Sequence, residues 1–232
     1  MREKNDLNRA LDLTTQLELE MDAYTLDLII RSRPTILEIL STRGYDVESY
    51  KDVAPDELLK LATTNQSLLT IIGKHKDDAE ARAVVLYFTE TPIRLRIDQM
   101  LEPLMNTEDS LYNPKKDEFV IMLSEPFHDI FHLKSAKLYA ANKHRVSFFN
   151  LKNLIGNPVR HTFVPPHRKL SAEEVAEAMK GLHLKSKHEL PHIKYHVDMQ
   201  ARVLGLVPGD IVEIKRPSET AGEYVMYRVC TV

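Results

Sequence analysis

The sequence predicts an α/β N-terminal domain followed by a small α+β C-terminal domain. Up to residue 155, short apolar runs alternate with amphipathic helical segments, which is typical of a layered α/β domain. Gly156, Asn157 and Pro158 then supply residues that favour a turn. Beyond them, one helix is followed by closely spaced strands and turns. We therefore expect an acidic helical arm at 1–30, an α/β domain at 31–155 and a C-terminal domain at 158–232.

The N-terminal arm is acidic and helical in pattern. Residues 1–30 contain seven acidic side chains against three basic ones, whereas the whole chain has a formal net charge of −3. Leucines and other apolar residues recur there at spacings near three or four. Pro34 is expected to start or kink a second helical segment over 35–42, which Gly44 ends.

Four strands and three helices are predicted in the rest of the α/β domain. Short apolar runs predict strands at 68–72, 83–88, 119–123 and 146–151. A helix is predicted at 55–61, because proline and acidic residues at 55–57 favour the first turn of a helix. Apolar residues with helical spacing predict a helix at 93–104, and a further helix is predicted at 131–142. Strands that alternate with helices in this way favour a sheet covered by helices.

The C-terminal domain opens with a helix and ends with two strands. Ser171 and Glu174 form a capping signature for a helix that Gly181 closes. Strands are predicted at 211–214 and 224–229, joined by the connector 216–222. Within the connector, Pro217 is expected to end the first strand, and Gly222 permits a backbone angle that most residues cannot adopt. Arg216 and Glu219 are near enough in sequence to pair with each other or with a partner.

Composition excludes several classes of protein. No apolar run is long enough to cross a bilayer, and the polar N-terminus is not a signal peptide. Cys230 is the only cysteine, which excludes an internal disulfide framework and a cysteine-rich zinc site. It is expected to be a small buried or edge-strand residue.

Residues 130–172 form a long basic segment. They contain no Asp or Glu, but eight Lys or Arg and four His. Such a segment predicts a face turned toward a polyanion. An acidic protein surface is an equally good partner on charge alone.

Two histidine pairs invite a metal-site interpretation. His188 and His192 match the zinc-protease pattern H-E-x-x-H, but Pro191 would break the helix that this pattern requires. His128 and His132 share the same spacing and are better explained as histidines at a helix start. Neither a glycine-rich phosphate loop nor a nucleophile elbow is present in the sequence. We therefore expect no catalytic residue, no metal and no cofactor.

Six motifs follow one another in order in the C-terminal third. They are His161-x-x-Val164-Pro165-x-His167, Leu170-Ser171-x-Glu173-Glu174-Val175, Leu190-Pro191-x-Ile193, Asp198-x-x-Ala201-Arg202-x-x-Gly205-Leu206, Gly209-x-x-Val212-x-Ile214 and Arg216-Pro217-Ser218-Glu219-Thr220-Ala221-Gly222-x-Tyr224-x-x-Tyr227-Arg228. This ordered set closely resembles the fifth-largest-subunit family of eukaryotic nuclear RNA polymerases, together with its archaeal counterpart. The N-terminal part is similar to the same family more loosely, through Arg43-Gly44-Tyr45 and the succession of strands and helices.

This resemblance implies a non-catalytic subunit of a multisubunit DNA-directed RNA polymerase. The C-terminal domain would be the assembly domain, which docks on the largest subunit beside other polymerase subunits. The N-terminal α/β domain would be a jaw close to downstream duplex DNA, bound without sequence specificity. The implied DNA-proximal residues are Lys134, Ser135 and Lys137. The implied assembly residues are Arg202, Arg216, Pro217, Ser218, Glu219, Thr220, Ala221, Gly222 and Tyr224.

The resemblance also implies a location and leaves rivals. A cellular member would lie in the nucleus, whereas a large-DNA-virus member would lie in the infected-cell cytoplasm and the virion. No membrane partner is expected. The rival interpretations are a metallohydrolase that uses residues 188–192, a nuclease built on the α/β domain, and a free transcription cofactor with the same fold.

Overall fold

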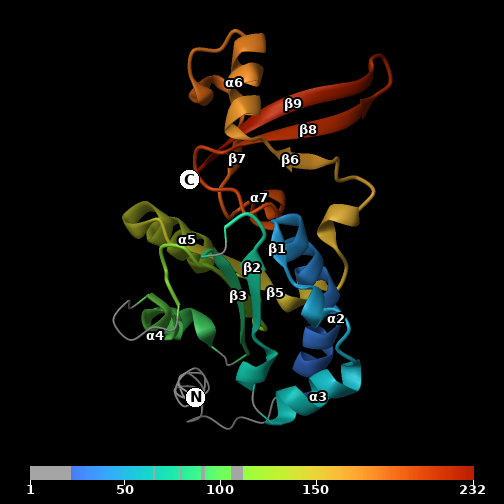
Figure 1. Cartoon of the computed structure of the whole chain (residues 1–232), viewed down its shortest axis with the longest axis vertical. Helices are drawn as coiled ribbons and strands as arrows, with labels where there is room; N and C mark the ends of the chain where they lie inside the picture. The colour runs from blue at the N-terminus through green and yellow to red at the C-terminus, as the bar shows by residue number, and fades with distance from the viewer. Residues whose placement is uncertain (1–21, 65, 79, 90–91, 106–111) are drawn as a thin grey trace. The chain divides into compact units, whose positions relative to one another are not determined.

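The computed structural model describes residues 22–64, 66–78, 80–89, 92–105 and 112–232 (Figure 1). The chain divides into two compact units, one ending at Gly156 and the other beginning at Asn157. Most of the predicted acidic arm, residues 1–21, lies outside the described residues. None of the helices in the described ranges is long and apolar enough to cross a bilayer.

The N-terminal unit alternates helices with strands, as the sequence predicts. The strands expected at 83–88 and 119–123 and the helices expected at 93–104 and 131–142 are confirmed within two residues at each end. The elements are α2 (Ala23–Thr42), β1 (Tyr45–Asp46), η1 (Glu48–Tyr50), α3 (Pro55–Thr64), η2 (Gln66–Leu69), β2 (Ile71–His75), β3 (Arg82–Phe88), α4 (Ile93–Met105), β4 (Glu118–Leu123), α5 (Asp129–Asn142), β5 (Arg145–Asn150) and η3 (Leu151–Leu154), where η marks a 3-10 helix.

Two predicted boundaries in this unit are wrong. Pro34 does not start a second helix but lies inside α2. An interior proline costs about 3 kcal/mol, and burial of Ile29, Ile36 and Leu40 on the same helix offsets this cost. The strand predicted at 68–72 begins only at Ile71, because the residues before it form the 3-10 helix η2. A short apolar run without periodicity does not distinguish the two structures.

The five strands form one mixed sheet in the order β1-β2-β3-β4-β5. Strand β2 is antiparallel to both β1 and β3, whereas β3, β4 and β5 are parallel to one another. All six residues of β4 are buried, as expected for a central parallel strand covered on both faces. Parallel strands need crossover connections, and α4 and α5 provide them.

The two faces of the sheet are covered by different helices (Figure 1). Alternate residues of β4 and β5, such as Phe119 and Phe148, pack with side chains of α4 and α5 in one apolar core. The other face meets α2, where the Arg43 guanidinium lies 5.9 Å from the ring centroid of Phe149. Side chains on this second face of the sheet are therefore shielded from water by α2.

The C-terminal unit contains a four-stranded sheet in the order β6-β8-β9-β7 and the helices α6 and α7. Its small core contains Leu170, Leu190, Ile211 and Val229, against which α6 packs. The predicted cap is confirmed, since Ser171 Oγ accepts from Glu174 N at 3.3 Å and Glu174 Oε2 accepts from Ser171 N at 2.8 Å. The elements are η4 (Pro158–Arg160), β6 (His167–Lys169), α6 (Ala172–Gly181), η5 (Lys187–Glu189), β7 (His192–Lys194), α7 (Met199–Val203), β8 (Ile211–Ser218) and β9 (Gly222–Thr231).

Cys230 is buried near the end of β9, in agreement with the expectation of a small interior residue. Burial raises the pKa of its thiol to about 12, and the Asp210 carboxylate acts in the same direction. The thiol is therefore protonated and shielded at neutral pH.

Candidate functional site

The connector between β8 and β9 is shorter than the sequence predicts. β8 continues through Pro217 to Ser218, which is the register partner of Gly222, so the loop contains only residues 219–221. The prediction that Pro217 ends the strand is wrong. Lys215 N donates to Pro166 O, on the side of β8 that faces β6. Backbone nitrogens two residues apart in a strand point to the same side, so the nitrogen of Pro217 also faces the β6 side. Strand β6 ends before it reaches Pro217, so no hydrogen bond between the strands is lost at the proline.

The loop is held together by its own polar groups. Ala221 N donates to Ser218 Oγ at 3.2 Å, and Ser218 Oγ lies 3.4 Å from Thr220 Oγ1. Gly222 has a φ of +74°, in the left-handed region that favours glycine. Within the described ranges, neither Arg216 nor Glu219 forms an ion pair, so of the two alternatives only pairing with a partner remains.

The outer half of the hairpin extends away from the rest of its unit (Figure 1). Here the hairpin tip is defined as residues 215–225, and all of them are exposed except the half-buried Ser218. Tyr224, 55% exposed, is the register partner of Arg216. Eight of the nine predicted assembly residues lie on this tip: Arg216, Pro217, Ser218, Glu219, Thr220, Ala221, Gly222 and Tyr224.

Arg202 differs from the other predicted assembly residues because it is buried. It lies on α7, whose first turn is capped by Asp198 accepting from Gln200 N at 2.8 Å. Burial lowers the pKa of Arg202 to about 10, and the carboxylate of Asp198 opposes this shift. Arg202 therefore lacks the exposure that the predicted assembly residues of the hairpin tip share, apart from the half-buried Ser218.

The three residues predicted to lie near DNA have different environments on α5. The Ser135 hydroxyl is buried and donates to Val146 O at 2.5 Å, which ties α5 to β5 and removes this side chain as a phosphate contact. Lys134 forms an ion pair with Asp98 of α4. Lys137 is exposed and forms no ion pair among the described residues. The DNA-contact hypothesis is thus narrowed to the two lysines, with Lys137 the more available.

The positive charge of the basic segment 130–172 is partly neutralised in the folded structure by acidic residues from other parts of the chain. Acidic residues from outside the segment pair with half of its eight cations: Lys134 with Asp98, Arg145 with Glu118, Arg168 with Glu174 and Glu213, and Lys169 with Asp210. Lys143 and Lys152 lie over the rings of Tyr139 and Tyr24. The positive charge of this segment is therefore partly compensated within each unit.

A buried charge cluster, which the sequence did not reveal, lies where the parallel strands begin. Glu118, at the start of β4, pairs with Arg43 and with Arg145 Nη2 at 2.8 Å, and accepts from Tyr45 Oη at 2.9 Å. Burial and the Glu118 charge raise the pKa of Tyr45 above its usual range. We call Arg43, Tyr45, Glu118 and Arg145 the Glu118 cluster. The available signal was Asp117-Glu118, two carboxylates directly before an apolar strand.

Residues 188–192 do not form the helix that a zinc protease requires. They contain the end of the 3-10 helix η5, an extended Leu190 and the start of β7. The Glu189 carboxylate accepts from Lys185 N at 3.0 Å and from Ser186 N at 2.7 Å, so it caps η5. Over the described ranges, no group of three or more His, Cys, Asp and Glu side chains could hold a metal.

The other histidine pair stabilises a helix start, as predicted. His128 is the N-cap of α5, and its Nδ1 accepts from Ile130 N at 3.3 Å. The ring of His132 lies 4.7 Å from that of Phe127. Both rings thus have structural contacts.

Comparisons with known proteins match both units. Residues 156–230 match the family model described as RNA polymerase Rpb5, C-terminal domain. The chain is 30% identical over 222 residues to "DNA-directed RNA polymerases I, II, and III subunit RPABC1" of Caenorhabditis briggsae, covering 90% of this chain and 97% of that protein. The protein of the same name from Caenorhabditis elegans is 30% identical over 221 residues, with the same coverage. The Dictyostelium discoideum subunit rpabc1 is 28% identical over 205 residues, covering 88% of this chain and 98% of its own length.

Proposed function

The chain belongs to the Rpb5 family of subunits of DNA-directed RNA polymerases I, II and III, and on this ground we propose that it is a non-catalytic subunit of a multisubunit DNA-directed RNA polymerase. The observation that carries the proposal is the similarity over nine-tenths of this chain to proteins named as polymerase subunits. The metallohydrolase alternative loses its basis at residues 188–192, because the Glu189 carboxylate caps a 3-10 helix there and the helix of a zinc protease is not formed.

The C-terminal unit is the assembly domain in this proposal, and the hairpin tip is its contact with the largest polymerase subunit. The tip exposes Arg216 and Tyr224, residue types that are enriched at protein interfaces. Strand β7 pairs with β9 only at 229–231, so no strand in the described part of the chain pairs with the outer backbone edge of β9 from 222 to 228. An open edge next to exposed side chains is suited to binding a partner chain.

Affinity purification of the tagged chain from its own cells tests this assignment. We expect co-purification with the two largest polymerase subunits at fixed stoichiometry. The triple variant Arg216→Ala/Glu219→Ala/Thr220→Ala should reduce that association, whereas Glu177→Ala/Lys180→Ala on the exposed side of α6 should not. Sub-stoichiometric recovery of polymerase would favour the free-cofactor alternative. Normal assembly of the triple variant would remove the docking role from the hairpin tip.

The N-terminal unit is the jaw in this proposal, close to downstream duplex DNA. Lys137 and Lys134 are three residues apart on α5 and share one face. Lysines bind phosphates as point charges without reading bases, so the contact would not depend on DNA sequence. The three relatives come from cellular organisms, which favours a nuclear location over an infected-cell one.

A further inference from the structure

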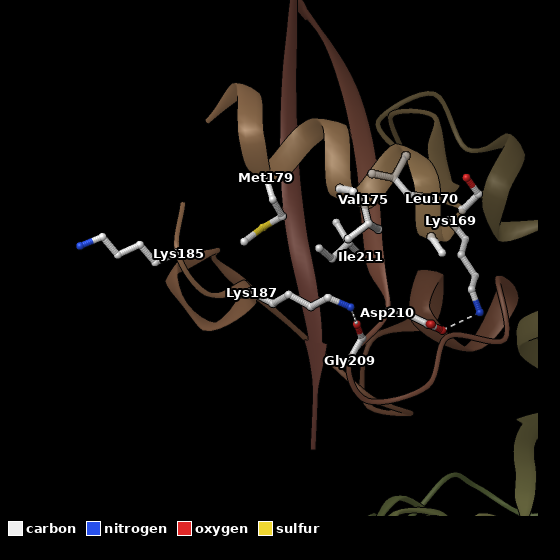
Figure 2. A pocket seen from close by; sticks show the side chains of 12 residues that line it. Lys169, Leu170, Val175, Met179, Lys185, Lys187, Gly209, Asp210 and Ile211 are labelled. Atoms are coloured by element: carbon white, nitrogen blue, oxygen red, sulfur yellow. Dashed lines mark hydrogen bonds and ion pairs between the residues drawn. The ribbon is translucent and has the colours of Figure 1, made fainter. Parts of the chain in front are cut away.

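A groove on the C-terminal unit has no part in the proposed docking by the hairpin tip. It encloses about 620 Å³ between α6 and the two loops that precede η5 and β8. Figure 2 shows Leu170, Val175, Met179 and Ile211 around its floor and three lysines around its rim. We call it the α6 groove. None of its lining residues belongs to residues 215–225.

The floor of the α6 groove is apolar and only partly covered. Leu170 and Ile211 are buried, but Val175 and Met179, which lie one helical turn apart on α6, are half-exposed. No residue of α6 is fully buried. The apolar face of an amphipathic helix is normally buried against other parts of the protein. Because Val175 and Met179 are only half-buried, part of the apolar face of α6 is exposed in the groove.

The rim of the groove is cationic. Lys169 is neutralised by Asp210, with Lys169 Nζ 2.7 Å from the Asp210 carboxylate. Lys187 Nζ instead donates to the Gly209 carbonyl at 3.2 Å and forms no ion pair within the described ranges. Lys185 is exposed and forms no ion pair among the described residues. Three lysines against one aspartate leave an excess of positive charge around an apolar floor.

We propose that the α6 groove binds a short acidic segment of a partner protein, whose apolar side chains contact Val175 and Met179 while its carboxylates pair with Lys185 and Lys187. The positive charge of the lysines on the rim favours a partner with negative charge, because complementary charges attract across an interface. The apolar floor selects a peptide rather than a nucleic acid, because the lining residues include no aromatic ring on which a base could stack. The two α6 glutamates nearest the helix start do not oppose this, since neither lines the groove.

The test uses the full chain and a defined probe, a fluorescein-labelled synthetic peptide in which leucines at helical spacing alternate with aspartates. Two companion peptides replace the leucines by serine or the aspartates by lysine. We expect binding at about 10 µM or weaker, as is usual for a small contact area. It should require both the leucines and the aspartates and should weaken with salt. Backbone amide shifts in an NMR titration should concentrate at Leu170, Val175 and Met179.

Surface variants distinguish binding in the α6 groove from non-specific electrostatic attraction of the acidic peptide to the protein. Ala176→Glu places a carboxylate at an exposed lining position and should weaken binding at least tenfold, as should Lys185→Glu/Lys187→Glu. Lys180→Glu makes the same kind of charge change on α6 outside the lining and should leave binding within twofold. Equal binding of the serine peptide, competition by duplex DNA of any sequence, or shifts centred on residues 215–225 would each overturn the proposal.

Discussion

The two units contain the same kinds of charged side chain and place them in opposite environments. In the Glu118 cluster, two arginines and a tyrosine surround one carboxylate, and Arg43 and Glu118 are almost wholly buried. At the hairpin tip, Arg216 and Glu219 are exposed and form no ion pair among the described residues. The buried set fixes how α2 and three strands meet, whereas the exposed set remains available to a partner.

This difference separates charged side chains that hold the sheet together from charged side chains that are exposed at the proposed interface. A buried charge without its partners is strongly destabilising, so the Glu118 cluster is tied to the fold. An exposed charge contributes little to stability and can change without unfolding the protein. The following predictions test whether the two regions differ as strongly as their burial indicates.

The largest effect is expected from Glu118→Ala. The variant leaves Arg43 buried without its carboxylate, which should cost about 3–5 kcal/mol of unfolding free energy. Urea unfolding followed by far-ultraviolet circular dichroism measures this loss, and hydrogen exchange of the β4 amides assigns it to the N-terminal unit. Glu219→Ala at the hairpin tip is the matched carboxylate change and should cost less than about 0.5 kcal/mol. Similar losses for the two variants would contradict the contrast between the regions.

Gly222→Ala should have a smaller and more local effect. The added Cβ has open space around it, so the cost comes from the positive φ alone and should be about 1–2 kcal/mol. Hydrogen exchange should accelerate for amides of the β8–β9 ladder near the loop. Gly181→Ala also meets open space, at the last residue of α6 and without a positive φ, and should be neutral or slightly stabilising. Unchanged exchange in the Gly222 variant would show that the loop does not depend on this angle.

Lowering the pH should destabilise both units through one histidine in each. Burial lowers the pKa of His144, with the Lys115 charge acting in the same direction. Burial also lowers the pKa of His167, against opposing contributions from Pro165 O and Asp198. The unfolded chain therefore binds these protons more readily, so the stabilisation is complete above pH of about 6.5 and is lost as the pH falls through the folded-state values. In His144→Gln, the stability of the β5 amides measured by hydrogen exchange should depend less on pH. The stability of the C-terminal unit should depend on pH as before.

The smallest effect is expected from removing one exposed lysine of α5. If Lys137 contacts DNA as proposed, Lys137→Ala should speed dissociation of elongation complexes and reduce the log–log salt slope by about 1, because the variant removes one phosphate contact. Lys134→Ala should do less, since Lys134 already pairs with Asp98. Lys180→Ala, in the other unit, is the control. Unchanged stability and slope in a normally assembled Lys137→Ala enzyme would remove the DNA contact from α5.

The sequence predicted elements better than it predicted which way side chains face. The apolar run 119–123 and the capping pair Ser171 and Glu174 were sufficient to locate β4 and α6, because strand burial and helix capping are local. The burial of Ser135 could not be predicted, since its hydroxyl meets Val146 only through the packing of α5 on β5. The prediction that Pro217 ends its strand is wrong because the tolerance of a proline there depends on where β6 ends. Both features depend on contacts between segments that are separated in sequence.

Because Cys230 is buried, the rate at which its thiol reacts reports on local opening of the C-terminal unit. A thiol reagent can attack this side chain only when β9 separates from its neighbours, because the thiolate is the reactive form and is strongly disfavoured in the folded unit. The rate of its modification therefore measures how often the C-terminal unit opens. Since the chain has no other cysteine, that rate can be compared before and after a partner is added without removing any competing thiol.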